Sequence, residues 1–316
     1  MVKKYISHLE TNQFEEIEEP EVGCWINMIN PTEEEILDIC SKINIKPDFI
    51  RYSLDYEEKA RIDMEDNDDT ILFVIDTPII EKTNKSEMYT TMPLGIIFVR
   101  DEYFITVSLN NNMIIDSFEN MRIKNFSTYK KSRFLLQIMY TNSGQFLKYL
   151  NHINKETEVT ENNLKDSMKN KELIKLLSLE KSLVYFSTSL KSNELVMEKT
   201  MKGKIIKLYD EDEDILEDAI IENRQAIEMC KIYTDILSNT MDAYASIISN
   251  NVNGVMKILT SITIILTIPT LIASLWGMNV PVPMQQNPLG FTIIVVASII
   301  IAFITMWWFR KRNMLD

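Results

Sequence analysis

The sequence has few of the residues that build catalytic and metal sites in proteins. Its 316 residues include only three cysteines and two histidines. The cysteines lie far apart and are odd in number, which argues against a disulfide framework and against zinc-ligand spacing. The histidines have no partner at ligand spacing, and there is no P-loop for a nucleotide. We therefore expect that the protein is not an enzyme and has no organic cofactor. The residues concerned are Cys24, Cys40, Cys230, His8 and His152.

Positive charge is also scarce. Lysine and arginine together number 33, against 46 aspartate and glutamate residues, so the formal net charge is −13. Nucleic-acid phosphates are bound by clustered cations, and nucleic acid is therefore not an expected partner. An acidic balance suits a protein that attracts cations, but it also keeps many ordinary proteins soluble. Composition alone leaves these two interpretations open.

One long stretch near the carboxyl end has no charge at all. No Asp, Glu, Lys, Arg or His occurs in residues 258–309. Two apolar runs, 255–275 and 289–309, each have the ~20 residues that a helix needs to cross a bilayer core. The connector, 276–288, contains three prolines and has no regular periodicity, which predicts a loop. Core helices of a soluble protein are the alternative, but they seldom run this long without charge. We predict a transmembrane hairpin.

Cations flank this hairpin at both of its ends. Arg310 to Arg312 follow the second span, and Lys257 opens the first. Both ends are therefore predicted to be cytoplasmic by the positive-inside rule, and Trp307 and Trp308 fit an aromatic belt there. The amino terminus has two lysines but no apolar core, so it is no signal peptide. We expect a multi-pass protein of the cell membrane with both termini in the cytosol and an outward loop.

The amino-terminal part alternates strand and helix patterns. The stretch "GCWINMINPTEEEILDIC" predicts a strand and then a helix that begins at Pro31-Thr32 with acids in its first turn. The stretches "DDTILFVIDTPII", "PLGIIFVRD" and "EYFITVS" predict strands, and from about Phe134 the pattern is helical. We predict a cytosolic α/β domain over 1–130, a helical region with a stalk helix over 131–252, and the transmembrane hairpin over 253–316.

The stalk is predicted to continue into the first span as one helix. Residues 210–252 contain neither Gly nor Pro, and their apolar positions recur at spacings of three and four. Gly254 is the only weak point before Pro269. We predict a helix from about Asp212 to Leu275, which would be roughly 95 Å long. Its apolar stripe comprises Leu216, Ile220, Ile227, Leu237, Met241, Tyr244 and Ile248.

A second stripe on this helix is polar. Its members alternate at spacings of four and three, and within the span five hydroxyls share one face. A threonine hydroxyl can simply bond back to its own helix, and small residues can permit close helix packing. Five hydroxyls in register with amides and carboxylates favour a water-facing pore wall instead. This polar stripe comprises Asp235, Asn239, Asp242, Ser246, Ser249, Asn253, Met256, Thr260, Thr263, Thr267, Thr270 and Ser274.

Two spans cannot enclose a pore, but several copies around an axis can. The apolar stripe would then face neighbouring helices and the polar stripe would face the lumen. Asp235, Asn239 and Asp242 are expected to line its cytosolic part. Met256 and Leu259, near the cytoplasmic end of the span, would form an apolar ring that gates by dewetting.

The carboxyl-terminal residues resemble those of the CorA-type magnesium transporters. The resemblance rests on Gly277-Met278-Asn279 at the outer end of the first of two spans, followed by a basic tail, and extends upstream through "NGVMKILTSITIILTIPTLIASLWGMN". It covers the whole chain in organisation. It implies a homopentamer with a funnel-shaped cytosolic domain and a pore lined by the first span. In that arrangement Asn279 forms the selectivity ring and Thr270 a hydroxyl ring beneath it, while Asn253, Met256 and Leu259 form the inner polar ring and constriction.

The implied cargo is Mg²⁺, which holds its water shell tightly. Carboxamide oxygens can accept hydrogen bonds from that shell without removing it, and neutral acceptors let the ion leave again. The membrane potential supplies about 2.3 kcal/mol per charge per 100 mV, doubled for a dication. Two alternatives stay open: the same fold transporting Zn²⁺, Co²⁺ or Ni²⁺, and a membrane-anchored sensor or scaffold that conducts nothing. The aligned hydroxyls argue against the second.

Two features depart from the resemblance. The loop "VPVPMQQNPLG" has no acids, so cation capture at the mouth would be weaker or would fall to Gln285, Gln286 and Asn287. The resemblance also implies a regulatory Mg²⁺ site, in which Asp218 is the stalk residue. Its counterpart falls within "FIRYSLDYEEK", where the matching positions are Arg51 and Tyr52. The carboxylates that would substitute are Asp55, Glu57 and Glu58.

Residues 210–222, "DEDEDILEDAIIE", are a run of acids around Asp218. Like charges at one end of a helix are usually a solvated face. The alternative is a divalent cation held between subunits. An EF-hand is excluded, because no Gly stands at the turn position that its loop needs.

Overall fold

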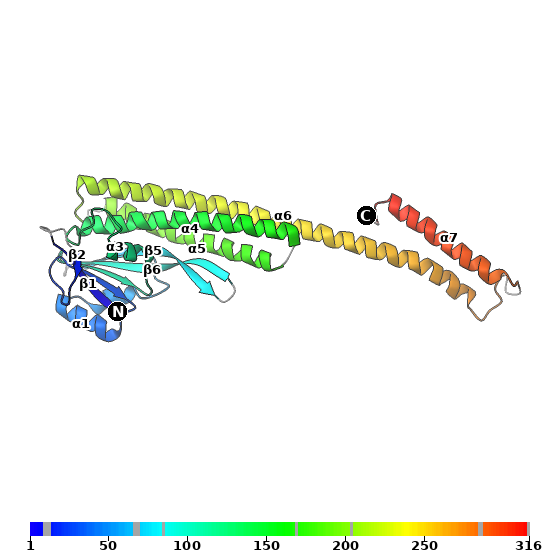
Figure 1. The fold of residues 1–316 in the computed structure, drawn as a ribbon, viewed down its shortest axis with the longest axis horizontal. Coiled ribbons are helices and arrows are strands. Elements are labelled where there is room, and N and C mark those ends of the chain that lie inside the picture. The colour runs from blue at the N-terminus through cyan, green and yellow to red at the C-terminus, as the bar shows by residue number, and fades with distance from the viewer. Residues whose placement is uncertain are drawn as a thin grey trace. The chain divides into compact units, whose positions relative to one another are not determined.

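The structure is a computed structural model of one chain and describes residues 1–8, 14–65, 70–83, 86–167, 170–202, 205–283 and 287–314. It contains two compact units, Met1–Ser238 and Asn239–Asp316. The first unit is built around a sheet and the second around a helical hairpin (Figure 1). One helix, α6 (Asp210–Trp276), contributes to both units.

A mixed seven-stranded sheet forms the centre of the first unit, in the order β2-β1-β3-β7-β6-β5-β4. Neighbouring strands are antiparallel except for β3 and β7, which are parallel and place Trp25 opposite Phe104. The predicted strands correspond to β3, β5, β6 and β7, whereas β1, β2 and β4 lie at or near the edges and are rich in charged residues. The strands are β1 (Val2–Ser7), β2 (Phe14–Glu16), β3 (Trp25–Ile29), β4 (Arg61–Glu65), β5 (Thr70–Thr83), β6 (Ser86–Val99) and β7 (Tyr103–Ser108).

Helices cover both faces of this sheet, as the alternation of its side chains requires. Leu72 and Val74 of β5 pack toward α1 and α2, whereas Phe73 and Ile75 pack toward α3, α4, α5 and the first part of α6. The predicted start of α1 is confirmed, with Thr32 as its N-cap in a capping box. The remaining helices are α1 (Glu33–Ile43), α2 (Pro47–Tyr52), α3 (Met113–Glu119), α4 (Lys131–Ser167) and α5 (Asn170–Lys202).

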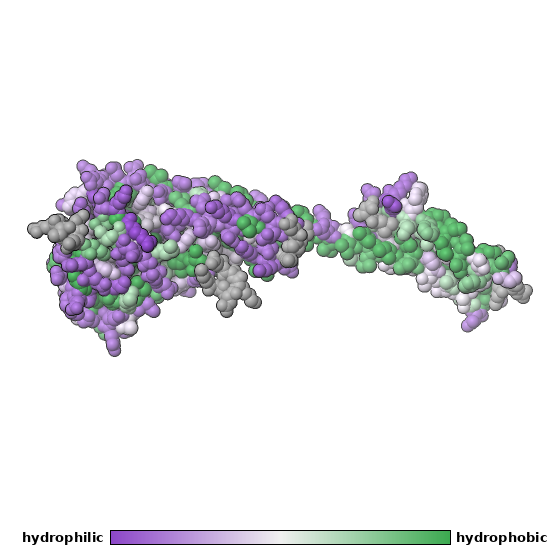
Figure 2. All heavy atoms as spheres, viewed as in Figure 1, coloured by the Kyte–Doolittle hydropathy of each residue, from purple (hydrophilic) through white to green (hydrophobic). Residues whose placement is uncertain are grey.

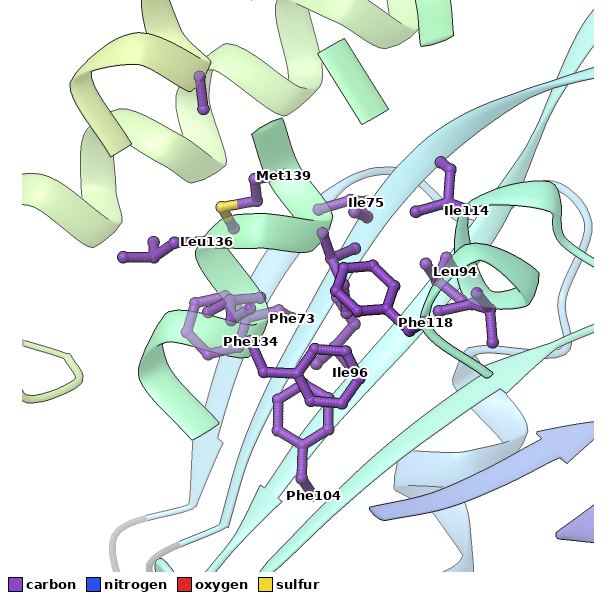
Figure 3. Close-up of a cluster of buried hydrophobic side chains, with 14 of the residues drawn as sticks. Phe73, Ile75, Leu94, Ile96, Phe104, Ile114, Phe118, Phe134, Leu136 and Met139 are labelled. Atoms are coloured by element: carbon purple, nitrogen blue, oxygen red, sulfur yellow. The ribbon is translucent and has the colours of Figure 1, made fainter. Parts of the chain in front are cut away.

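Aromatic rings anchor the helical layer on the sheet. Phe134, near the start of α4, is fully buried and stacks on Phe104 of β7 with ring centroids 4.3 Å apart. Figure 3 shows these two rings together with Phe118 of α3 and Phe73 of β5. Offset and edge-on aromatic pairs of this kind stabilise a core beyond the area that they bury. The base of the helical stalk is therefore fixed to the sheet.

Beyond the end of β4, the side chain of Asn193 supplies the hydrogen bonds that a neighbouring strand would otherwise make to β5. β4 pairs with β5 only as far as Val74, and farther along Asp76 lies opposite Pro93, which has no N–H. The Asn193 amide accepts from the Asp76 N–H and donates to the Asp76 carbonyl, both at 2.8 Å. Asn142 donates to the same carbonyl at 2.9 Å. The Asp76 side chain is only 9% exposed, and burial raises the pKa of its carboxyl to about 6.

The second unit consists of the carboxyl-terminal part of α6 and of α7 (Gly290–Lys311). Both helices are long and apolar enough to cross a membrane, and hydrophobic residues dominate the visible surface of this unit (Figure 2). The predicted spans, 255–275 and 289–309, fall on these two helices. The predicted continuous helix is confirmed, because α6 begins and ends within two residues of the expected positions.

Candidate functional site

The two stripes predicted on α6 differ in their exposure. Within the single chain, Leu216, Leu237 and Tyr244 of the apolar stripe are buried, and its other members are buried or half-buried. All twelve residues of the polar stripe are exposed. Apart from Met256 these residues are polar, and polar groups on a helix that is apolar enough to cross a membrane are expected to face water or polar partners. The polar stripe is therefore the candidate functional site.

The threonine hydroxyls of the stripe donate to their own helix. Thr260 donates to the carbonyl of Met256 at 2.7 Å, and Thr263 to that of Leu259 at 2.8 Å. Thr267 and Thr270 make the same bond four residues back, at 2.7 and 2.9 Å. A hydroxyl has one proton to donate and two lone pairs that accept. Because the proton is used within the helix, each hydroxyl presents acceptors to the surrounding medium.

The amino-terminal end of the stripe carries its negative charge. Asp235, Asn239 and Asp242 are exposed, and neither aspartate forms an ion pair within the described ranges of the chain. Ser246 donates to the Asp242 carbonyl at 3.1 Å. Above them come Asn253 and then the exposed apolar side chains of Met256 and Leu259, 53% and 57% exposed. Along α6 the carboxylates thus come first, Ser246, Ser249 and Asn253 follow, and the apolar pair precedes the threonine hydroxyls.

The loop after α6 is folded back on its own backbone. The Trp276 indole N–H donates to the Pro283 carbonyl at 3.0 Å, and the Gly277 N–H donates to the Ala273 carbonyl at 2.9 Å. A Cβ at Gly277 would lie 3.2 Å from that carbonyl oxygen, which explains why the helix ends on glycine. Met278 and Asn279 follow and are exposed.

The three polar residues named for the outer mouth have different outcomes. Gln285 and Gln286 lie outside the described residues. The side-chain Oδ1 of Asn287 accepts from the Leu289 N–H at 3.0 Å, so this amide oxygen already has a partner beside the start of α7. Of Asn279 and Asn287, Asn279 is therefore the one whose exposed side-chain amide is better placed to meet a cation.

The predicted regulatory residues lie in two separate places. Asp218 is exposed on α6, one turn before Glu222. The Glu222 carboxylate, and less strongly that of Asp218, raise the pKa of the Tyr140 hydroxyl on α4. Burial raises the pKa of Glu222 itself, and the charge of Asp218 adds to that shift. Among the described residues, no three His, Cys, Asp or Glu side chains gather where they could hold a metal ion.

The amino-terminal candidates have local partners. Asp55 accepts from the Glu57 N–H at 3.0 Å, and Glu58 pairs with Arg61. The residues at the matching positions are also engaged: Arg51 binds Glu33 at 2.8 Å, and the Tyr52 ring lies under the Arg61 guanidinium. A regulatory site made from these residues and Asp218 would therefore need a second subunit.

Sequence reasoning missed the ion pairs at the start of α6. Arg133 of α4 binds Asp212 at 2.8 Å and Glu211 at 2.7 Å. Asp212 is only 2% exposed, and both acids raise the pKa of the Arg133 guanidinium. Two members of the acidic run are therefore ion-pair partners of Arg133: Asp212 is buried and Glu211 is exposed. Arg133 and Asp212 are 79 residues apart, and no local pattern marks the pair.

Comparison with known proteins identifies the family. The model of the CorA-like Mg²⁺ transporter proteins matches residues 20–311. The chain belongs to this family. The CorA-type resemblance is thereby confirmed, and the protein is a membrane transport protein, not an enzyme. The cobalt/magnesium transport protein CorA of Methanocaldococcus jannaschii is 27% identical over 299 residues, which span 92% of this chain and 90% of that relative.

Two solved full-length structures share the fold. The complete CorA magnesium transporter from Methanocaldococcus jannaschii superposes with a TM-score of 0.83 at 24% identity, covering 98% of both chains. The full-length CmaX protein superposes with a TM-score of 0.72 at 14% identity, covering 98% of this chain and 96% of that one. The predicted fold class is confirmed: an amino-terminal α/β domain, a long stalk helix that continues into the first candidate span, and a second carboxyl-terminal helix.

Proposed function

We propose that five copies of this chain enclose a pore lined by the polar stripe of α6, and that hydrated Mg²⁺ moves through it down its electrochemical gradient. The observation that carries the proposal is the row of exposed hydroxyls whose protons are used within the helix. Family membership makes Mg²⁺ the expected cargo. The number of copies rests on the resemblance and on the preference of oligomers for closed rotational symmetry.

The chemistry of such a wall suits a hydrated cation. The waters around Mg²⁺ direct their hydrogens outward, and the ion gives them up reluctantly. A lumen of neutral acceptors can bond to that shell at each hydroxyl level and release it to the next. Asn279 would form the outermost ring, where an amide oxygen accepts as the hydroxyls do. Gly277 and Met278 would set its position at the end of α6.

The charges along the stripe are arranged for passage toward the cytosol. The described part of the outer loop has no carboxylate, so the ion would meet neutral groups first. Met256 and Leu259 would close the pore when dry, because an apolar ring without water opposes a charged ion. Beyond it, Asp235 and Asp242 would attract the cation once it has passed. With both termini in the cytosol, a negative interior drives Mg²⁺ inward.

A regulatory site between subunits extends the proposal. Asp218, which is exposed, and Glu222, which is half-buried, lie one helical turn apart on α6. Asp55, Glu57 or Glu58 of a neighbouring subunit would complete a Mg²⁺ site that closes the pore when internal Mg²⁺ is high. If Asp218→Ala leaves inhibition by internal Mg²⁺ unchanged, this part of the proposal is wrong.

Co²⁺ is the second candidate cargo, because the relative from Methanocaldococcus jannaschii is named as a cobalt/magnesium transport protein. Reconstitution of the full chain into liposomes, with influx of Mg²⁺, Co²⁺, Zn²⁺ and Ni²⁺ measured separately, tests both. Mg²⁺ influx that rises with an inside-negative potential supports the proposal. Influx of Zn²⁺ or Ni²⁺ alone would identify another cargo. No influx of any of the four would favour the sensor or scaffold.

A further inference from the structure

Four cations gather around the end of α7 in the second unit. Arg310 and Lys311 close the helix, and Arg312 is its C-cap. The chain then turns back, and the Ser261 hydroxyl of α6 donates to the Met314 carbonyl at 3.2 Å. Residue 257 is a lysine one helical turn before Ser261 and therefore lies on the same face of α6. We call Lys257, Arg310, Lys311 and Arg312 the tail cluster.

The tail cluster has no carboxylate partner within the described residues of its unit. Asp242 is the one acid in residues 239–283 and 287–314, and it precedes Lys257 by about 22 Å along the helix. None of the four cations forms an ion pair with a described residue. The negative end of α7 supplies only about half a charge. Figure 2 shows hydrophilic residues at this end of the unit, beside its hydrophobic middle.

Two exposed tryptophans place this charge at the depth of lipid headgroups. The Lys311 ammonium lies 5.4 Å from the ring centre of Trp307, and the Arg312 guanidinium lies 5.6 Å from that of Trp308. The two indoles are 64% and 49% exposed. Tryptophan is enriched at the membrane–water interface, and clustered Lys and Arg beside a transmembrane helix attract anionic lipids.

An apolar hollow lies deeper along α7, separated from the tail cluster by the residues after Ile300. Ile300, Trp307 and Lys311 follow each other at spacings of seven and four, which places them on one face of the helix. The hollow has a volume of about 360 Å³. Its lining residue nearest the tail cluster is Ile300, which precedes Arg310 by about 15 Å along the helix. An acyl chain can pack against such an apolar surface, whereas a free phosphate ion cannot. The hollow is lined by Thr292, Ile293, Val296, Ala297 and Ile300.

We propose that this end of the hairpin is a binding site for an anionic glycerophospholipid, with its phosphate on the tail cluster and one acyl chain along the face of α7. The site depends on the two candidate membrane helices and not on the proposed ion path. It would hold one lipid against α7 of each subunit. The lipid charge then supplies the counter-charge that the described part of the unit lacks.

Lipid binding to the purified full chain in a neutral detergent tests this site. Native mass spectrometry would count bound phosphatidylglycerol and, separately, bound phosphatidylcholine, in the absence of divalent cations. The parent should bind phosphatidylglycerol well and phosphatidylcholine poorly. Each cation exchanged for Gln should weaken phosphatidylglycerol binding about fivefold. Because no ion flux is measured, Asn279→Ala should bind lipid as the parent does even if the proposed transport fails.

Matched variants separate the site from general charge. The triple variant K181Q/K191Q/K199Q removes three exposed cations of α5, including Lys181 with its own ring partner Tyr185, and should bind lipid as the parent does. The charge-conserving R310K/R312K should retain most of the binding if R310Q/R312Q loses it. Undiminished phosphatidylglycerol binding by R310Q/R312Q would overturn the proposal. Full competition by inorganic phosphate would overturn it as well, since it would show a phosphate site without a role for the acyl chain.

Discussion

The buried carboxyl of Asp76 should make the stability of the first unit depend on pH. Burial raises its pKa from 3.8 to about 6. Between these values the folded state binds a proton that the unfolded state has lost, so the free energy of unfolding falls as pH rises from about 4 to 6. A shift of about two pKa units corresponds to about 3 kcal/mol. For a unit of this size that is roughly 6–12 °C in unfolding temperature.

The assay compares the unfolding temperature of the full chain in detergent with that of Asp76→Asn at several pH values. The variant keeps the shape of the side chain but cannot ionise, so its advantage over the parent should grow from pH 4 to pH 6 and then stay constant. Asp214→Asn removes an exposed carboxyl and should leave the pH profile of the parent unchanged. Parallel profiles for the parent and Asp76→Asn would refute the reasoning.

Three further predictions concern named contacts. Arg133→Met leaves Asp212 buried without its partner and should lower the free energy of unfolding by about 3–5 kcal/mol in a denaturant titration; a loss below about 1 kcal/mol would contradict the pair as described. Thr32→Ala removes the capping box of α1 and should cost about 1 kcal/mol in the same titration, where unchanged stability would count against the cap. Thr270→Val removes one outward acceptor and should slow Mg²⁺ influx about fivefold. Thr305→Val removes the same type of hydroxyl-to-carbonyl bond from α7 and should leave Mg²⁺ influx unchanged. An equal reduction of influx in both variants would argue against the polar stripe as the pore wall.

The parts of the fold that could be predicted are those with a local signal. The charge-free runs and the periodicity of 210–252 predicted both candidate spans and α6, because a helix repeats its environment every turn. Thr32 before three glutamates marked the start of α1 in the same way. The sheet order could not be read, because the parallel pairing of β3 with β7 joins residues about 80 positions apart. The edge strand β4 carries charges that obscure its alternation.

Contacts between distant side chains were equally invisible in the sequence. Asn193 completes the sheet beside Asp76 from 117 residues away, and nothing in the sequence around it indicates that role. The same holds for Arg133, whose partners lie in the acidic run. The polar stripe could be read from the sequence because its twelve residues recur at spacings of four and three on one helix. Its function as a lumen, like the pairing of Asp218 with another subunit, depends on neighbouring chains and stays a prediction.

The most direct test of the proposed pore is Mg²⁺ influx through Asn279→Ala in liposomes. Asn287→Ala is the matched control, because it removes an amide from the same loop whose oxygen is already bonded to the Leu289 N–H. If Asn279 forms the selectivity ring, its variant should lose most Mg²⁺ influx or lose discrimination between Mg²⁺ and other divalent ions, while Asn287→Ala transports as the parent does. Unchanged rate and selectivity in Asn279→Ala would contradict the account.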